Sequence, residues 1–293
     1  MAMRSHFRTS LALCVLLIPA CTYPPSIPAP WEAVEPQSAE PPVAAPPKLV
    51  PKWARFGASV RGKALMAATI GEGPRRIYII GGIHGDEPEA PATAELLPEL
   101  LAESANLPNS TIRVVKDMNP DGAAAKTRTN TRRVDLERNW PSKDFQREAR
   151  SGDRPLSELE TLAVHTDLLA FKPDIVIVFQ SANLPPSVSS LGSGRTLAHS
   201  FCSAARKADP HWRFSPEQRN RPPGSIESLV GVDMGKTVLR VEFQRNTAAS
   251  RNARAVLAGL TALDQPPAQT PPASSTPSTP ASSPAAQAAP TGR

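Results

Sequence analysis

The sequence predicts an α/β fold, with a mixed, largely parallel sheet, helices on both faces and proline-rich segments at either end. Apolar, β-branched runs of strand length alternate along the chain with runs of helical pattern. Such alternation is typical of a sheet that helices cover on both faces. The 34 prolines among the 293 residues cluster at the two ends, so the foldable domain is predicted to span residues 52–264.

Four apolar runs predict buried strands, because the strands of a parallel sheet are covered on both faces and carry nearly continuous apolar sequence. They are residues 77–83, 112–118, 175–179 and 238–243. In sheets of this kind, functional groups gather beyond the carboxyl ends of the strands. His84, Asn119 and Gln180 stand at those positions.

Four segments between and after these strands predict helices. They are residues 88–104, 155–173, 194–208 and 249–263. In the second of them, Ser157 and Glu160 have the spacing of a capping box, and Pro173 marks the end of the helix.

The two ends of the chain predict export and tethering rather than packed structure. Residues 1–20 combine basic residues with an apolar stretch too short to span a bilayer, as in a signal peptide. The Ile-Pro-Ala-Cys segment resembles a bacterial lipobox with an atypical proline, so we expect a lipid anchor on Cys21, with plain secretion as the alternative. Residues 21–51 predict a proline-rich tether, and residues 265–293 predict a disordered tail. Together they predict a periplasmic, membrane-anchored lipoprotein.

The formal net charge of +6 falls mostly on the predicted domain. The sequence has no lysine-rich run and no row of aromatic residues that would stack on bases, so we expect no nucleic-acid partner. A substrate that carries a carboxylate suits a basic surface better. With Cys14 in the signal peptide and Cys21 as the anchor, Cys202 stands alone and no disulfide is predicted in the domain.

The stretch YIIGGIHGDEPEAPA, residues 78–92, places His84 and Glu87 just after the first predicted strand. An imidazole and a carboxylate at this spacing can converge on one Zn²⁺ ion. The structural alternative is a helix start, where acidic residues are stabilised by the helix dipole and the histidine packs beside them. The spacing alone leaves both interpretations open.

A second motif block, residues 117–141, begins with Asn-Pro-Asp-Gly after the second predicted strand and continues with four arginines. These are Arg128, Arg132, Arg133 and Arg138. Arginines on loops at the carboxyl edge of a sheet are suited to binding a carboxylate through two hydrogen bonds. A solvated basic loop is the structural alternative.

In order along the chain, His-x-x-Glu, Asn-Pro-Asp-Gly, Thr-Arg-x-Asn and Val-Asp-Leu-x-Arg-Asn-aromatic-Pro resemble motifs of the zinc metallocarboxypeptidases of the carboxypeptidase A type. The segment Pro-Leu-Ser-Glu-x-Glu-Thr at 155–161 is similar to the bacterial branch that includes murein peptide amidase. Residues 224–243 are similar to the part of the family that carries the catalytic glutamate. The resemblance extends from about residue 77 to residue 243.

The resemblance implies an enzyme of the zinc metallocarboxypeptidase or amidase type, with one zinc ion. His84 and Glu87 would ligate the zinc, and Glu242 would be the general base that activates water and passes its proton to the leaving amine. The structural alternative for Glu242 is an ion pair with Arg240 or Arg245.

The resemblance also implies a substrate clamp. Arg128 would stabilise the oxyanion, and Arg138 with Asn139 would hold the terminal carboxylate of the substrate. Glu137 stands where the family has asparagine, and we expect it to repel that carboxylate or to neutralise Arg138. Arg133 likewise replaces a glycine.

The family's third zinc ligand is a histidine, and the matching position here is Gln180, followed by Ser181. An amide oxygen is a poorer zinc ligand than an imidazole, so we expect reduced zinc affinity. His165 lies within a helical pattern and is expected to be structural. His199 and His211 do not follow strands, although a loop could still bring either one to the site.

These observations predict a hydrolase of amide bonds in peptides, with a peptide or peptidoglycan-derived substrate from the cell wall. Two alternatives stay open. A degenerate metal site would make the protein a peptide- or wall-binding lipoprotein without catalysis. An aspartoacylase-like deacylase of N-acyl amino acids would keep the chemistry and change the substrate, but the complete second motif block argues against it.

Overall fold

The computed structural model describes residues 51–104, 107–215 and 221–265. A boundary between two compact units falls after Pro46, and every described residue belongs to the second unit. The predicted signal peptide, Cys21 and nearly all of the predicted tether and tail lie outside the described residues. None of the helices within the described ranges is long and apolar enough to cross a membrane.

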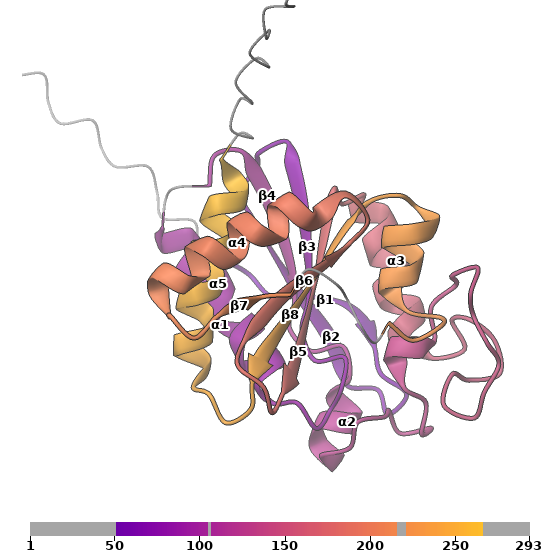
Figure 1. The fold of residues 1–293 in the computed structure, drawn as a ribbon. Coiled ribbons are helices and arrows are strands. Elements are labelled where there is room, and N and C mark those ends of the chain that lie inside the picture. Colours follow the sequence, from indigo (N-terminus) through magenta and orange to yellow (C-terminus); the bar gives the residue numbers. More distant parts are fainter. Residues whose placement is uncertain (1–50, 105–106, 216–220, 266–293) are drawn as a thin grey trace, which may run out of the picture. The chain divides into compact units, whose positions relative to one another are not determined.

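An eight-stranded sheet forms the centre of the domain, in the order β1-β2-β4-β3-β5-β8-β6-β7 (Figure 1). Its strands are β1 (Ala54–Ala58), β2 (Ala64–Ile70), β3 (Arg75–Ile80), β4 (Ser110–Val115), β5 (Ile175–Ala182), β6 (Ser187–Leu191), β7 (Arg213–Phe214) and β8 (Thr237–Gln244). The central strands β4, β3, β5 and β8 pair in parallel. Strands β1, β2 and β6 add antiparallel pairs on either side of them. The predicted mixed sheet and its four central strands are confirmed.

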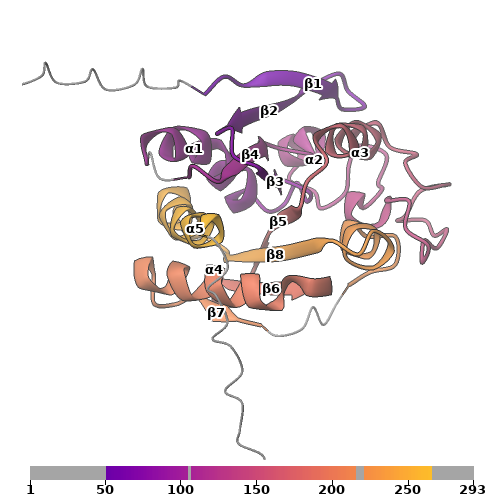
Figure 2. The same cartoon turned by 90° about the horizontal axis from the view of Figure 1, so that it is seen from above.

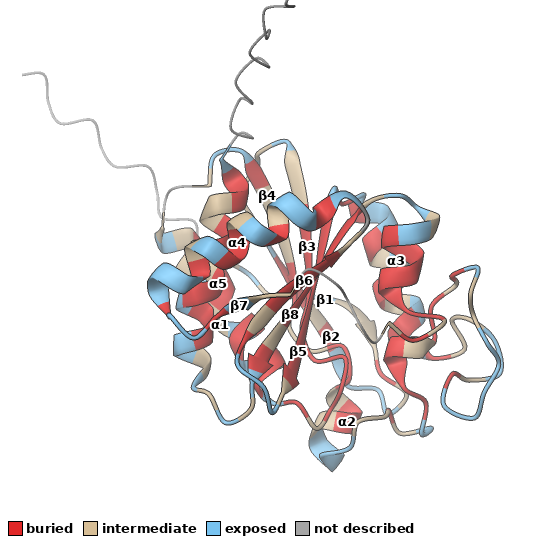
Figure 3. Ribbon diagram, in the orientation of Figure 1, coloured by how far each residue is buried: buried red, intermediate tan, exposed pale blue. Residues whose placement is uncertain are grey.

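Helices cover both faces of the sheet, as Figures 1 and 2 show. The α-helices are α1 (Glu89–Glu103), α2 (Pro120–Ala125), α3 (Leu159–Phe171), α4 (Arg195–Ala208) and α5 (Ala249–Asp264). Helices α1, α4 and α5 pack on one face, in a core that includes Phe179, Phe201 and Phe243. Helix α3 packs on the other face, in a core that includes Tyr78 and Trp140. Most of β3, β5 and β8 and the inner faces of the helices are accordingly the buried parts of the ribbon (Figure 3).

The capping box predicted at the start of α3 is wrong. The residue before the helix is Glu158, and its side chain makes no capping hydrogen bond. Ser157 Oγ donates to Glu158 Oε1 at 2.9 Å, while Glu160 Oε1 accepts from the backbone N–H of Val60 at 3.0 Å. These carboxylates hold distant segments against the helix, so tertiary contacts take the place of the local cap.

Parallel pairing brings the carboxyl ends of β3, β5 and β8 to the same edge of the sheet. The chain leaves β3 through a turn at Gly82, where φ is +67° and a Cβ would lie 2.3 Å from Asp117 Oδ1. Glycine is the residue that adopts this conformation without strain. The turn delivers His84 to the edge at which Gln180 and Glu242 end their strands.

Candidate metal and active site

His84 and Glu87 face each other just beyond β3. Nδ1 of His84 lies 3.0 Å from Oε1 of Glu87, and both side chains are buried. The other oxygen of Glu87 accepts a hydrogen bond of 2.7 Å from the backbone N–H of Ser181, at the end of β5. At Gly85 a Cβ would lie 2.0 Å from the backbone of Gly122, so the loop of His84 fits against the start of α2 only because residue 85 has no side chain.

The second nitrogen of His84 faces two more carboxylates. Nε2 lies 3.3 Å from Asp135 Oδ1 and 3.4 Å from Glu137 Oε2. Burial disfavours the charged imidazole, but hydrogen bonds to Asp135, Glu137 and Glu87 outweigh burial and raise the pKa of His84 well above its usual value. The pocket therefore stabilises positive charge at this position.

Arg128 binds the outer side of the same carboxylates. Its Nε lies 3.1 Å from Asp135 Oδ2, and its Nη2 lies 2.9 Å from Glu137 Oε2. The remaining nitrogen, Nη1, lies 3.6 Å from Glu87 Oε1. Because the side chain is 40% exposed, this third nitrogen is the part of the guanidinium that is least engaged with the protein.

Glu137 also connects the site to a buried ion-pair cluster that the sequence did not reveal. Its Oε1 accepts hydrogen bonds of 2.9 Å from Gln180 Nε2 and from Arg240 Nη2. Arg240 in turn donates to Glu227 Oε1 at 2.6 and 2.9 Å. Burial raises the pKa of Glu137, but the hydrogen bond with His84 and the charge of Arg240 outweigh burial, so the pKa of Glu137 lies below its usual value.

The prediction that Glu137 neutralises Arg138 is therefore wrong. Residues 136–138 form a short 3₁₀ helix, in which successive side chains point a third of a turn apart. Glu137 points inward to Arg128 and Arg240, while Arg138 lies with its Nε 3.6 Å from Asp135 Oδ2. The guanidinium of Arg138 is about one-third exposed, and its Nε has no hydrogen-bond partner among the described residues.

Asn139 has a structural role instead of the predicted role in substrate binding. Its side chain is fully buried. Its Nδ2 donates to the backbone oxygens of Ser151 and Arg154 and to Ser157 Oγ, and its Oδ1 accepts from the backbone N–H of Glu158. These contacts use the whole amide within the fold.

Glu242 lies beside Gln180 in the sheet, since the two residues are paired in the parallel register of β5 and β8. Glu242 Oε2 accepts a hydrogen bond of 3.2 Å from Ser187 Oγ on β6. The ion pair considered between Glu242 and Arg240 does not form. Arg240 binds Glu137 and Glu227 instead. Arg245 binds Asp86 at 3.5 Å.

The other histidines stay away from this cluster in the described part of the chain. His165 packs edge-on against Trp140, and His199 packs edge-on against Phe214. His211 lies 2.9 Å from Asp209. Gln180 thus remains the residue at the position of the third ligand.

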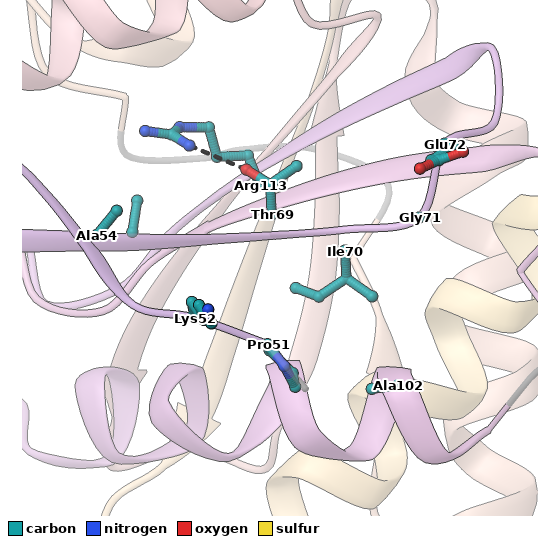
Figure 4. A pocket seen from close by; sticks show the side chains of 10 residues that line it. Pro51, Lys52, Ala54, Thr69, Ile70, Gly71, Glu72, Ala102 and Arg113 are labelled. Atoms are coloured by element: carbon teal, nitrogen blue, oxygen red, sulfur yellow. Dashed lines mark hydrogen bonds between the residues drawn. The ribbon is translucent and has the colours of Figure 1, made fainter. Parts of the chain in front are cut away.

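A cavity of about 660 Å³ adjoins the site. It is lined by Gly85 and Asp86 from the loop between His84 and Glu87, and by Glu89, Asp117 and Arg245. A different cavity, of about 420 Å³, lies near β2, where Arg113 donates to Thr69 Oγ1 at 2.9 Å (Figure 4). Neither cavity is lined by any of the predicted site residues, but the first lies beside the loop that carries His84 and Glu87.

Comparisons with known proteins agree with this geometry. Residues 44–181 match the family model of the zinc carboxypeptidases. This part of the chain, 138 of the 293 residues, resembles the zinc carboxypeptidases. No curated protein matches the sequence.

Several solved structures share the fold. A metallo-carboxypeptidase from Burkholderia cenocepacia has a TM-score of 0.59 at 21% identity, over 74% of this chain and 64% of that one. Murein-tripeptide amidase from Escherichia coli O157 has a TM-score of 0.56 at 21% identity, over 73% and 92% of the two chains. Bovine thrombin-activatable fibrinolysis inhibitor has a TM-score of 0.60 at 17% identity, over 73% and 88%. The chain thus spans about 64% of the Burkholderia protein's length, and at these identities the likeness establishes the fold.

The donor set of His84 and Glu87 fits a zinc ion. His84 offers Nδ1 and Glu87 offers Oε1 at 3.0 Å from each other, while Asp135 lies against the other ring nitrogen. A carboxylate in that place orients a metal-ligating imidazole. The carboxylates of Glu87, Asp135 and Glu137 surround the imidazole, so the pocket also favours a cation.

A second group of possible metal ligands consists of His84 Nε2 with Asp135 and Glu137. Their carboxylates are already paired with Arg128 at 3.1 and 2.9 Å, and Glu137 is also paired with Arg240 at 2.9 Å. Glu87 is less engaged, with its nearest guanidinium nitrogen 3.6 Å away. The Nδ1 side of His84, with Glu87, is therefore the better place for a metal.

Asp135, Arg240 and Glu227 are the site residues that sequence reasoning missed. Asp135 is part of the Val-Asp-Leu motif, but its contact with His84 joins segments far apart in the sequence. The sequence does contain a signal for Arg240. An arginine inside an apolar strand is almost never buried without a partner, so an acidic partner could be expected. The sequence could not identify that partner.

Proposed function

We propose that this chain is a zinc-dependent hydrolase of amide bonds in peptides, with a cell-wall peptide as the substrate. The observation that supports it most is the alignment at one sheet edge of His84, Glu87 and Glu242, with Arg128 at the rim. The similarity to murein-tripeptide amidase supports the substrate class.

His84, Glu87 and Gln180 would hold the zinc ion, which when bound polarises the scissile carbonyl and acidifies water. Glu242 would accept the proton of the attacking water and pass it to the nitrogen of the leaving amine. Its hydrogen bond from Ser187 keeps the carboxylate at the edge of the sheet.

The two arginines at the rim would act on the substrate directly. Arg128 has two nitrogens bound to Asp135 and Glu137, which leaves Nη1 to donate to the oxyanion that develops on the carbonyl oxygen. Arg138, whose side chain is about one-third exposed, would bind the terminal carboxylate of the peptide.

Metal analysis and hydrolysis assays on the purified full chain test this function. We expect one zinc per chain and cleavage of peptidoglycan-derived peptides that end in a free carboxylate. Glu242→Gln should retain zinc and lose roughly a hundredfold or more in kcat, as general-base catalysis contributes about that much. Glu87→Gln should lose zinc as well.

The same assays separate the alternatives. Zinc-free protein that binds wall peptides without cleaving them would replace the proposed hydrolase with a binding protein. Cleavage of N-acyl amino acids in preference to peptides would place the activity with the deacylases. Equal activity of wild type and Glu242→Gln would contradict the assigned base.

A further inference from the structure

Two of the residues at which this chain departs from the zinc carboxypeptidase motifs that it resembles touch each other. Gln180 stands in place of a histidine, and Glu137 stands in place of an asparagine. Gln180 Nε2 donates to Glu137 Oε1 at 2.9 Å, and the exposed fractions of the two residues are 6% and 4%. A contact this well buried cannot be replaced by water, so the two side chains determine each other's orientation.

The chemistry of the pair decides which end of the amide faces Glu137. An ionised carboxylate only accepts hydrogen bonds, whereas an amide carries a donor nitrogen and an acceptor oxygen on the same carbon. Gln180 must therefore present Nε2 to Glu137 and turn Oε1 away from it. An asparagine at position 137 would accept either end of the amide, because it can donate as well as accept.

Glu137 is itself held firmly. Its Oε1 also accepts from Arg240 Nη2 at 2.9 Å, and its Oε2 accepts from Arg128 Nη2 at 2.9 Å. Arg240 is fixed in turn by Glu227, which is fully buried. Two guanidinium groups on opposite oxygens keep the carboxylate ionised and immobile.

The end of β5 is also in contact with the ligand that faces His84. Glu87 Oε2 accepts a hydrogen bond of 2.7 Å from the backbone N–H of Ser181. Ser181 directly follows Gln180 in β5. Glu87 Oε1 lies 3.0 Å from His84 Nδ1. Glu137 thus lies on the nitrogen side of the Gln180 amide, and the backbone of the next residue, Ser181, contacts Glu87.

We infer that Glu137 is a positioning residue that directs the amide oxygen of Gln180 toward the metal, so that the two departures compensate for each other. The inference rests on the proposed zinc-dependent function. Outer carboxylates that orient metal ligands commonly change metal affinity by about ten- to a hundredfold when they are removed. Here the carboxylate orients an amide instead of an imidazole.

Zinc affinity of the full chain, measured by competition with a chromogenic chelator, tests the inference without any need for catalysis. Glu137→Gln should weaken zinc binding by about tenfold or more, because the amide of Gln180 is then free to turn. The exchange of both residues, Glu137→Gln with Gln180→Glu, should restore the affinity at least to that of wild type. In that variant the amide of residue 137 donates to the new carboxylate, whose second oxygen faces the metal.

Matched controls separate this role from a structural one. Glu227→Gln changes the same ion-pair cluster without touching Gln180, and it should leave zinc affinity within about twofold. Gln180→Leu keeps both arginine pairs of Glu137, and it should weaken zinc binding by about tenfold or more even if Glu137→Gln does not fold.

The outcomes that would overturn the inference are distinct. Wild-type affinity in Glu137→Gln or in Gln180→Leu would overturn it and leave the proposed function intact. A double exchange that binds zinc no better than Glu137→Gln alone would overturn it as well. A wild-type chain that binds no zinc would overturn both the inference and the proposed function.

Discussion

Gln180 at the end of β5 lies directly beside Glu242 at the end of β8, as partners in the parallel register of the sheet. Neighbouring strands are about 4.8 Å apart and paired residues project from the same face, so these two side chains share one corner of the site. The same pair of strands thus fixes both Gln180, the weakest predicted metal ligand, and Glu242, the predicted base. A change at residue 180 should therefore act on metal binding and leave the sheet in place.

Gln180→His should raise zinc affinity by at least about tenfold, which corresponds to about 1.4 kcal/mol. The imidazole can donate one N–H to Glu137, as the amide does now, and present its other nitrogen to the metal. Zinc titration of the wild type and the variant measures the change, and His84→Ala serves as the control that should lose binding. Equal affinities for the wild type and Gln180→His would show that residue 180 is not at the third ligand position.

Asp117→Asn should stabilise the protein at neutral pH. Burial raises the pKa of Asp117 to about 6, above the unfolded value of about 3.9. The folded state therefore binds the proton more tightly, and its stability falls as the pH rises from about 4 to about 6. The variant removes that loss, while Asn can still accept the hydrogen bond that Asp117 Oδ1 takes from the backbone of Asn119.

Denaturant unfolding at pH 4 and at pH 7.5 measures the effect of Asp117→Asn. We expect a gain of roughly 1–2 kcal/mol at pH 7.5, which is less than the full shift because the side chain is partly accessible, and little gain at pH 4. Asp153→Asn is the matched control, since the Asp153 side chain is 90% exposed. A gain that is equal at both pH values would contradict the assigned cause.

Gly259→Ala should destabilise the protein although alanine favours helices by about 1 kcal/mol over glycine. A Cβ at position 259 in α5 would lie 2.6 Å from three ring atoms of Phe201 in α4, and that ring is fully buried. Overpacking of this kind costs about 1–3 kcal/mol. Thermal unfolding should show a lower Tm, whereas Arg254→Ala on the exposed side of the same helix should change it little. A higher Tm for Gly259→Ala would mean that the two helices separate without cost.

Cys21→Ser should release the protein from the membrane fraction, if the sequence at the end of the signal peptide directs acylation as proposed. Detergent partitioning of the wild type and the variant measures the change. Cys14→Ser, in the same leader, should leave partitioning unaltered. A wild-type protein that is found only in the aqueous phase would contradict the lipid anchor.

The strands that the sequence revealed are the ones with continuous apolar runs. β3, β5 and β8 are largely buried on both faces and carry runs of apolar residues, and β4 has Ile112, Val114 and Val115 at buried positions. β6, with the sequence SVSSL, lacks that signal and forms because it pairs with β8. β2 is rich in alanine and pairs with the outer side of β4. A strand that is stabilised mainly by its neighbour leaves little trace in its own residues.

By itself, the sequence determined which side chains reach the carboxyl edge of the sheet. His84 and Gln180 follow apolar strands, and Glu242 ends one, so parallel pairing alone brings them to one edge. The tertiary structure decided which charges meet there. Glu137 has Arg138 as its sequence neighbour, yet it pairs with Arg128, Arg240 and Gln180. The physical reason is burial, because a carboxylate withdrawn from water must be paired by whichever donors share its pocket, and only the folded chain determines which donors those are.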